Sequence, residues 1–529
     1  MSEAVSAMPA RQLYVAPAIN PWFIALTVTL ATFMEVLDTS IANVSLPHIA
    51  GGLGAGVDES TWILTSYLVS NAIVLPMSGW ISSIIGRKRF YMACVALFTI
   101  SSFLCGLAPN LASLIFFRVL QGAGGGGLQP SEQSILADTF APEKRGMAFA
   151  VYGMAVVVAP AIGPTLGGFI TDNYSWRWIF YINVPIGIIS ILLTSRIITD
   201  PPHLSGARRE GGIKIDYIGL GLLALGLGAL QVVLDKGQRD DWFGSHFILE
   251  LTIISVTALI AVVFWEWHAK YPVIDLKLFR DRSFAIGNSM MFMLGFILLG
   301  TTLLLPLFTQ TMLGYTAETA GLALMPGGLV ILASMPIVGF LLGRYDPRRI
   351  MIFGLCMLTG ALFFMTRFDL YIDFRTAALA RIIQGMGLAC LFVPINTVAY
   401  SYLPPEKNNA ASGLINLARN VGGSIGISYV TTMLDRRMQF HRARLSAHLN
   451  PANPRVQQML HGASGALRAG SGPAAKMQAY SLLERMLDRQ STMLSYIDNF
   501  HILALITMAM IPFVFLIRKP RRRAGVPAH

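Results

Sequence analysis

Residues 118–127 read RVLQGAGGGG, and residues 381–390, 263 positions further on, read RIIQGMGLAC. Both segments contain R-x-x-Q-G-x-G, and Pro-Glu-Lys follows each at the same offset, at residues 142–144 and 405–407. A shared membrane composition would repeat leucine and glycine, but it does not explain matched arginine, glutamine and Pro-Glu-Lys. The sequence therefore predicts two similar halves, a layout in which transporters place their binding site between the repeats.

The composition around these motifs is typical of a polytopic membrane protein. The 529 residues are 54% hydrophobic and 13% charged, whereas soluble chains carry about 25% charged residues. This excludes an ordinary soluble enzyme, a disordered chain and a disulfide scaffold. We attribute the net charge of +12 to cytoplasmic loops rather than to nucleic-acid binding. The first apolar run begins at Pro21, after a segment without the apolar core of a signal peptide.

Because a helix needs about 20 apolar residues to cross the hydrocarbon core, the chain can be divided into candidate spans. We expect an all-α membrane protein with fourteen of them. They cover residues 22–46, 60–84, 89–108, 111–136, 146–170, 177–197, 215–235, 246–266, 284–311, 317–343, 350–366, 376–403, 409–434 and 497–517.

The distribution of basic residues predicts the orientation. With the N-terminus in the cytoplasm, 23 lysines and arginines fall in cytoplasmic segments and five in the short loops of the opposite side. The positive-inside rule then favours cytoplasmic N- and C-termini. The long outer loop 435–496 carries nine more, but long loops translocate largely regardless of charge. Within it, residues 476–489 have the apolar spacing of an amphipathic helix that rests on the membrane or on a partner.

These spans divide the chain into five parts. Two six-helix halves flank a linker with two inserted helices, and a basic tail ends the chain. The parts are a cytoplasmic segment (1–21), the N-terminal half (22–197), the linker (198–283) with helices at 215–235 and 246–266, the C-terminal half (284–517) and the tail (518–529).

Several motifs resemble the major facilitator superfamily, in particular its fourteen-helix drug:proton antiporter branch of EmrB/QacA type. The resemblance covers essentially the whole chain, and its finer features favour the EmrB side. The motifs are LDTSIANVSLP at 37–47, the arginine motif at 118–124, GPTLGG at 163–168, WRWIFYINVP at 176–185, LDKG at 234–237, DWF at 241–243 and NPANP at 450–454.

The resemblance implies a proton-coupled exporter of hydrophobic drugs that acts in a tripartite system with a periplasmic adaptor and an outer-membrane channel. The alternative is a single-component exporter, or a dedicated exporter of one metabolite such as a fatty acid. No Gly-Lys dipeptide is present, so the P-loop of an ATP-driven pump is missing. We expect no enzymatic activity, no cofactor, no metal site and no nucleic-acid partner. The expected ligands are lipophilic small molecules, protons and membrane lipids.

Charged residues inside spans are the first candidates for function, because each costs at least about 2.5–3.5 kcal/mol at a helix centre. Asp38 and Arg118 lie at one depth, about 10–12 Å from the outer ends of their helices at 1.5 Å per residue. We expect an ion pair that protonation of Asp38 breaks. The alternative is a static pair that only fixes helix register.

Two further acids lie near this pair. Glu35 shares a helix face with Asp38. It is either a second proton site or an attractor of cationic substrates, unless it contacts a polar neighbour such as Asn288. Glu132 lies far along its helix, so we expect a solvated charge at the cytoplasmic edge.

Two arginines in the C-terminal half complete the charged set. Arg381 has no acid at a matching depth, which favours a structural role, whereas Arg419 is a candidate for binding anionic substrates. Asn43 and Gln121 are further candidates for substrate contact, together with Glu35.

Glycines and prolines mark the candidate gating segments. Gly79, Gly86 and Arg87 belong to a loop motif in which Ser83 replaces the usual acid, which puts a charge-based latch there in doubt. The glycine run 122–127 favours close helix packing or a hinge over a dinucleotide site, because no βαβ unit surrounds it. The other predicted gating residues, in a deformable fifth span, are Pro160, Gly163, Pro164, Gly167 and Gly168.

Overall fold

The computed structural model describes residues 20–141, 143–200, 216–270, 272–401, 403–449, 454–466 and 473–517. In these residues the regular structure is helical throughout. Twelve helices are long and apolar enough to cross a membrane, and the bent helix α7 makes a thirteenth. The remaining predicted span, 409–434, lies within a longer and more polar helix, α17 (Asn408–Ser446). Each of the fourteen predicted spans therefore coincides with a helix.

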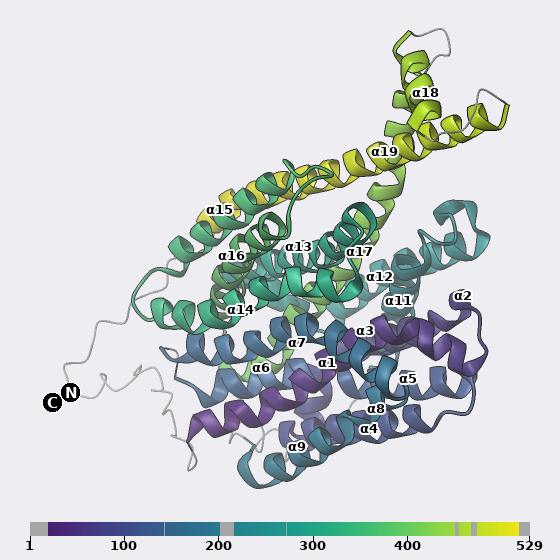
Figure 1. Ribbon diagram of the computed structural model, residues 1–529. Helices are drawn as coiled ribbons and strands as arrows, with labels where there is room; N and C mark the ends of the chain where they lie inside the picture. The colour runs from purple at the N-terminus through teal and green to yellow at the C-terminus, as the bar shows by residue number, and fades with distance from the viewer. Residues whose placement is uncertain are drawn as a thin grey trace, which may run out of the picture.

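The helices form two groups that face each other along the bundle (Figure 1). Two short segments, α2 (Val57–Ser60) and α8 (Trp178–Tyr181), accompany the first group. Its long helices are α1 (Pro21–Leu53), α3 (Trp62–Ile85), α4 (Arg87–Leu107), α5 (Leu111–Gly125), α6 (Leu128–Thr139), α7 (Arg145–Asn173) and α9 (Asn183–Ile197). The second group consists of α13 (Arg282–Leu313), α14 (Ala317–Leu342), α15 (Pro347–Met365), α16 (Phe374–Tyr400), α17, α19 (Pro473–Ala509) and α20 (Ile511–Phe515).

The inserted helices α11 (Tyr217–Lys236) and α12 (His246–His268) lie beside this bundle. Helix α11 packs against α3 and α17, one helix from each group. Ser424 on α17 donates a hydrogen bond to Gln231 over 3.1 Å, and Thr65 on α3 donates to Asp235. Helix α12 exposes most of its apolar stretch, of which only 22% is buried, whereas 78% of that of α16 is buried.

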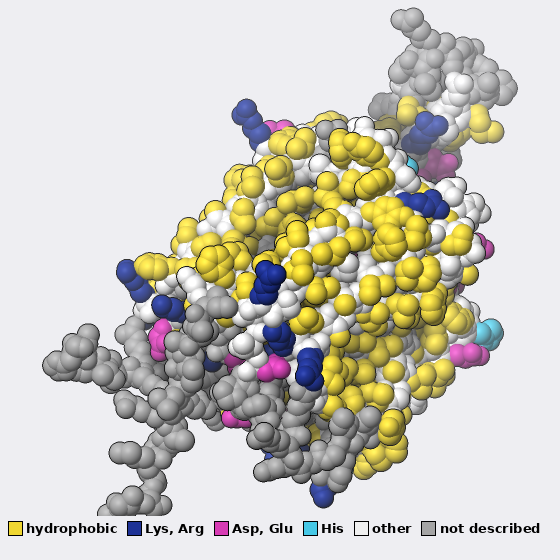
Figure 2. Space-filling view, turned by 90° about the horizontal axis from the view of Figure 1, so that it is seen from below, with side chains coloured by type: hydrophobic (Ala, Val, Ile, Leu, Met, Phe, Trp, Pro, Cys, Tyr) yellow, Lys and Arg dark blue, Asp and Glu magenta, His cyan; other side chains and the backbone are white. Residues whose placement is uncertain are grey.

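Large apolar side chains cover the outside of the bundle, as expected for a surface that faces lipid. Figure 2 shows an almost unbroken hydrophobic surface with few charged groups. Exposed examples are Phe23 on α1 and Phe264 on α12, with 60% and 71% of their surface accessible. The end of the bundle that holds Pro21, Arg87 and Lys407 is called the basic end below. The opposite end, from which α18 (Pro454–Ala466) projects, is called the hairpin end.

Much of the predicted outer loop 435–496 is helical. Helix α17 continues to Ser446, and α19 joins the amphipathic stretch 476–489 to the last span without a break (Figure 1). Ion pairs connect the two helices: Asp498 accepts from Arg437 at 2.5 Å, and Arg442 contacts Asp488 at 2.8 Å. These contacts hold a helical extension away from the bundle.

Breaks and bends in the helices occur at glycine and proline residues. The predicted span 111–136 is split between α5 and α6 within the glycine run, where a Cβ at Gly126 would lie 2.7 Å from the carbonyl oxygen of Asn71. The two parts of α7, Arg145–Pro160 and Ile162–Asn173, meet at 42°. Proline removes a helical hydrogen bond and clashes with the preceding turn, which accounts for the bend at Pro160.

Candidate functional site

A buried ion pair joins α1 to α5 in the N-terminal group. Nη1 of Arg118 lies 2.7 Å from Oδ2 of Asp38, and the two side chains are 0% and 1% exposed. The predicted pair is therefore present. Removal of both charges from water is costly, so such a pair persists only when further hydrogen bonds satisfy both groups.

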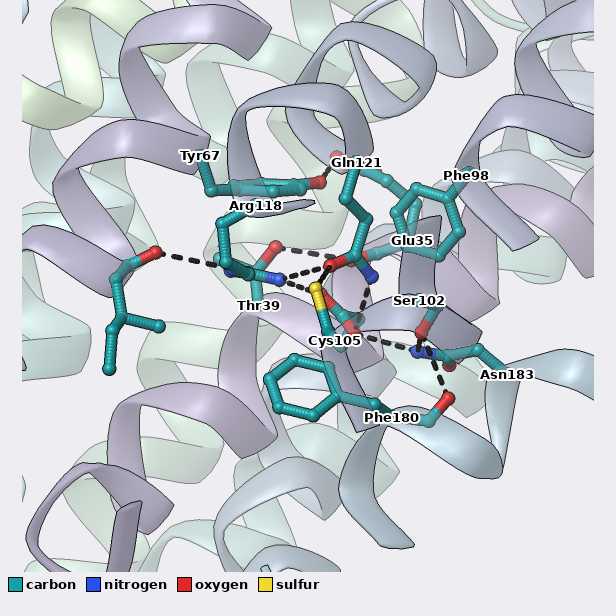
Figure 3. A network of polar contacts seen from close by, with 12 residues as sticks. Glu35, Thr39, Tyr67, Phe98, Ser102, Cys105, Arg118, Gln121, Phe180 and Asn183 are labelled. Atoms are coloured by element: carbon teal, nitrogen blue, oxygen red, sulfur yellow. Dashed lines mark hydrogen bonds and ion pairs between the residues drawn. The ribbon is translucent and has the colours of Figure 1, made fainter. Parts of the chain in front are cut away.

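Neutral groups supply most of these bonds (Figure 3). The other carboxylate oxygen, Oδ1 of Asp38, accepts from Asn183 at 2.6 Å and from Gln121 at 3.0 Å. Arg118 also donates to Oε1 of Gln121 at 2.8 Å, and its guanidinium lies 4.2 Å from the centroid of the Tyr67 ring. Among the described residues, Nη2 of Arg118 finds no hydrogen-bond partner. Gln121 thus belongs to the ion-pair network rather than standing free to contact a substrate.

Glu35 lies one turn from Asp38 and is also buried, but its contacts are all neutral. It accepts hydrogen bonds from Gln129 at 2.6 Å, from Tyr67 at 3.1 Å and from Asn71 at 3.4 Å. Within the described residues no hydrogen bond joins it to Asn288, the polar neighbour that the sequence suggested. Tyr67 contacts both groups of residues. Its ring faces the guanidinium of Arg118, and its hydroxyl donates a hydrogen bond to Glu35.

Arg419 reaches this cluster from the C-terminal group. Its Nη1 donates to the hydroxyl of Tyr152 at 2.9 Å, and its Nη2 donates to Oε1 of Gln129. The amide of Gln129 therefore bridges Glu35 in one half and Arg419 in the other. This bridge connects the two halves through groups that are all buried.

A second ion pair closes the basic end. Arg87 contacts Asp138 at 2.7 Å, and Asn408, at the start of α17, donates to Asp138 at 2.6 Å. Ser134 and Ser412 form a hydrogen bond across the same interface at 2.7 Å. Asp138, at the end of α6, thus provides a carboxylate for Arg87 beside a loop motif in which Ser83 replaces the usual acid.

The predicted gating glycines differ in their surroundings. A Cβ at Gly79 would lie 2.7 Å from the carbonyl oxygen of Asn409, and Gly86 has a φ of 91°, which favours glycine. On α7, a Cβ at Gly163 would lie 2.5 Å from Cβ of Ser40, and one at Gly167 would lie 3.1 Å from Ile41. Pro160 and Pro164 lie within α7, and Gly168 has open space.

Three other candidates lie apart from the network. Asn43 is exposed and donates to the carbonyl oxygen of Thr39 on its own helix. Arg381 contacts only neutral groups, namely Gln384 at 2.8 Å and Thr302 at 3.4 Å. The prediction of a solvated Glu132 was wrong: this side chain is fully buried, because α6 runs inside the bundle against α1 and α7.

Sequence reasoning missed several residues of these contacts, among them Asn183, Gln129 and Asp138. Asn183 lies in the quoted stretch 176–185, but its contact with Asp38 depends on the packing of α9 against α1. Gln129 and Asp138 lie three residues before and six residues after Glu132 on α6. Polar residues at helical spacing around an intramembrane acid were the available signal.

Comparisons with known proteins identify the family to which this chain belongs. The family model of the Major Facilitator Superfamily matches residues 28–427. The chain is 38% identical over 501 residues to the Multidrug export protein EmrB of Escherichia coli (strain K12), covering 94% of this chain and 96% of that protein. It is also 38% identical over 508 residues to the Fatty acid resistance protein FarB of Neisseria gonorrhoeae, covering 95% and 97%.

A solved structure supports the same fold. The proton:xylose symporter XylE matches with a TM-score of 0.59 at 16% identity, covering 93% of this chain and 96% of that one. The chain therefore belongs to the major facilitator superfamily and to its EmrB-type drug efflux proteins. It is a multi-pass membrane transporter rather than an enzyme, as the sequence predicted.

Proposed function

We propose that this protein is a proton-coupled antiporter that exports lipophilic compounds across a bacterial inner membrane, with both termini in the cytoplasm. The observation that carries the proposal is the buried Asp38–Arg118 pair. Intramembrane charges are costly and typically mark ion or proton pathways. The basic end then faces the cytoplasm. The proton gradient drives transport, and the transporter needs no cofactor.

The proposed coupling step is a change of charge at Asp38. A proton on this carboxyl removes the attraction that holds Arg118, and the neutral donors Gln121 and Asn183 lose a charged acceptor. Helices α1, α5 and α9 can then change their packing. The opposing hypothesis, a pair that only fixes helix register, predicts no dependence of transport on protonation.

We assign substrate contact to Glu35, Gln129 and Arg419, because their bridge joins the two halves. Substrate that enters between the halves must part Gln129 from Arg419, which leaves a guanidinium for an anionic group and a carboxyl for a cationic one. The relatives' names, multidrug export and fatty acid resistance, are consistent with lipophilic substrates. Export of a single metabolite such as a fatty acid stays the alternative.

We further propose that the extension at the hairpin end contacts a periplasmic adaptor, and that an outer-membrane channel completes the system. Exposed apolar side chains on α18 and α19 support this, among them Met459 and Met486, 44% and 51% exposed. Cysteine cross-linking from Met486 to a co-expressed adaptor tests the idea. Full drug resistance without any adaptor would indicate a single-component exporter instead.

Everted membrane vesicles with an acidic interior test the coupling. We expect lipophilic substrates to dissipate the pH gradient with the wild type and not with Asp38→Asn or Arg118→Ala at equal expression. A gradient-coupled response in Asp38→Asn would move the coupling site to Glu35. A wild type without response to any compound would contradict drug:proton antiport.

A further inference from the structure

Four side chains that can form hydrogen bonds recur at every third position of α1: Thr29, Thr32, Glu35 and Asp38. Successive members lie about one turn apart, so the four form a continuous stripe that is inclined to the helix axis. The stripe runs from the ion pair toward the basic end, with Thr29 about 14 Å from Asp38 at 1.5 Å per residue. A polar stripe of this length inside an apolar bundle is costly unless it has a function.

Glu132 on α6 lies at the far end of this stripe. Its Oε1 accepts a hydrogen bond from the hydroxyl of Thr29 at 2.6 Å. Its Oε2 and the hydroxyl of Thr32 are both buried, and Thr32 interacts with the Glu132 carboxyl as Thr29 does. Glu132 itself is 0% exposed. Within the described residues, the carboxyl is therefore enclosed by neutral hydroxyl groups of the stripe.

No cation balances this acid in the part of the chain that the structure describes. The titratable groups that face it are Glu35 on α1, Tyr91 on α4 and Tyr152 on α7. Tyr91 donates to the carbonyl oxygen of Val28, and Tyr152 lies between Gln129 and Asn416. An ionised carboxylate without a counter-charge is expensive to bury, so the neutral carboxyl is the form that these surroundings favour.

Gln129 connects this acid to the rest of the site. It lies one helical turn before Glu132 and donates to Glu35. Glu132 is thus the third acid in a series that begins at Asp38 and passes through Glu35, and it is the one nearest the basic end. The ion pair neutralises Asp38, but nothing in this arrangement neutralises Glu132 except a proton.

We propose that Glu132 is a proton-binding site through which protons pass between Glu35 and the basic end. The inference rests on the proposed proton coupling. In the step, the O–H bond of Glu132 breaks and its proton passes to water at the basic end, leaving a carboxylate. The carboxyl of Glu35 then gives its proton, by way of the hydroxyls of Thr32 and Thr29, to that carboxylate. One proton has then reached the basic end, and the negative charge lies on Glu35, which takes up the next proton from the side of Asp38.

Glu132→Gln tests the proposal without disturbing the packing. A glutamine keeps an oxygen that accepts from Thr29, but it cannot carry a proton. We expect gradient-driven transport in proteoliposomes to fall about 100-fold, the scale of a lost proton-transfer group. Substrate exchange at equal pH on both sides should persist, because this reaction needs no net proton movement. Thr27→Val is the matched control, because it removes a buried hydroxyl of α1 that lies outside this path and donates to the carbonyl oxygen of Phe23 on its own helix; it should retain coupled transport.

Infrared spectroscopy of the purified full-length protein supplies the second measurement. We expect the carbonyl stretch of protonated carboxyls in the wild type and in Asp38→Asn. In Glu132→Gln we expect the component of Glu132 to be lost while that of Glu35 remains. A structural glutamate predicts wild-type coupling in Glu132→Gln, and that result would overturn the proposal, as would an unchanged carboxyl band. A wild type that ignores the pH gradient overturns the proposed antiport itself, a failure that needs no variant to be recognised.

Discussion

The two halves contain the same arginine motif in different electrostatic environments. The arginine of the N-terminal half lies beside a carboxylate, and that of the C-terminal half contacts neutral groups. In the N-terminal half, Arg118 contacts Gln121, and both bind the carboxylate of Asp38. In the C-terminal half, Arg381 contacts Gln384 with the same geometry, and Gln384 donates to the hydroxyl of Thr301 at 2.6 Å. Thr301 stands 263 positions after Asp38, the offset of the repeat itself.

The same replacement recurs at other positions of the repeat. At this offset, every charged residue of the N-terminal network except Arg118 has an uncharged counterpart in the C-terminal half. The pairs are Glu35 and Leu298, Asp38 and Thr301, Arg87 and Ile350, Glu132 and Ile395, and Asp138 and Ser401. The repeat therefore preserves helix packing, while these four acids have no acidic counterpart in the C-terminal half. The C-terminal half contributes Arg419, whose counterpart is Val156.

The largest effect is expected when the acid beside the arginine motif is moved from the N-terminal half to the C-terminal half. The double variant Asp38→Thr/Thr301→Asp moves the carboxylate beside Arg381, where Leu298 replaces Glu35. We expect gradient-driven transport in proteoliposomes to fall about 100-fold, because the moved acid has no second acid one turn away. Thr301→Asp alone serves as the control and should keep coupling. Wild-type transport by the double variant would show that either half can carry the proton.

Loss of Arg118 and loss of Arg381 should lower the free energy of unfolding by different amounts. Arg118→Met leaves Asp38 buried without its partner, and loss of one member of a buried pair costs about 3–5 kcal/mol. Arg381→Met leaves only neutral groups, whose lost hydrogen bonds are worth about 1 kcal/mol each. Thermal unfolding of the two purified variants in one detergent gives the comparison. Equal destabilisation would mean that Arg381 has an anionic partner in the folded protein.

The sequence was sufficient for the fold, because apolar length and repeated motifs are properties of the chain alone. The fourteen spans and the Asp38–Arg118 pair could be predicted, since helical rise places both residues at one depth. Glu132 was misplaced because distance along a helix does not reveal which neighbours cover it. The bridge of Gln129 between Glu35 and Arg419 could not be predicted either, because it depends on how α6 and α17 approach each other across the halves.

A smaller effect is expected for the Arg87–Asp138 ion pair at the basic end, because the C-terminal half has an isoleucine and a serine at the corresponding positions. Asp138→Asn removes the partner of Arg87 and weakens the contact with Asn408. We expect the basic end to open more often, which raises maleimide labelling of a Ser412→Cys reporter about tenfold, equivalent to 1.4 kcal/mol. Cys356, the exposed native cysteine, is replaced by serine in this background.

A surface pair at the same end provides the matched control. Asp275 contacts Lys407, whose side chain is 48% exposed, and exposed pairs contribute little. Asp275→Asn should leave labelling of the reporter unchanged. If the two variants increase labelling equally, the Arg87–Asp138 pair is not a specific latch.

The last prediction concerns the close helix packing that the two halves share, where the smallest difference between them is expected. Gly163 on α7 packs against Ser40 of α1, and Gly426, at the repeat offset on α17, packs against Phe296 of α13. A Cβ at Gly426 would lie 2.8 Å from the Cα of Phe296, so alanine at either glycine forces neighbouring helices apart and should cost about 1–3 kcal/mol. Gly168 faces open space, and alanine there should stabilise its helix by about 0.5–1 kcal/mol. Unfolding of the three single variants measures these differences. If Gly426→Ala is tolerated while Gly163→Ala is not, the halves differ in packing as well as in charge, and the divergence of the repeat extends beyond its acids.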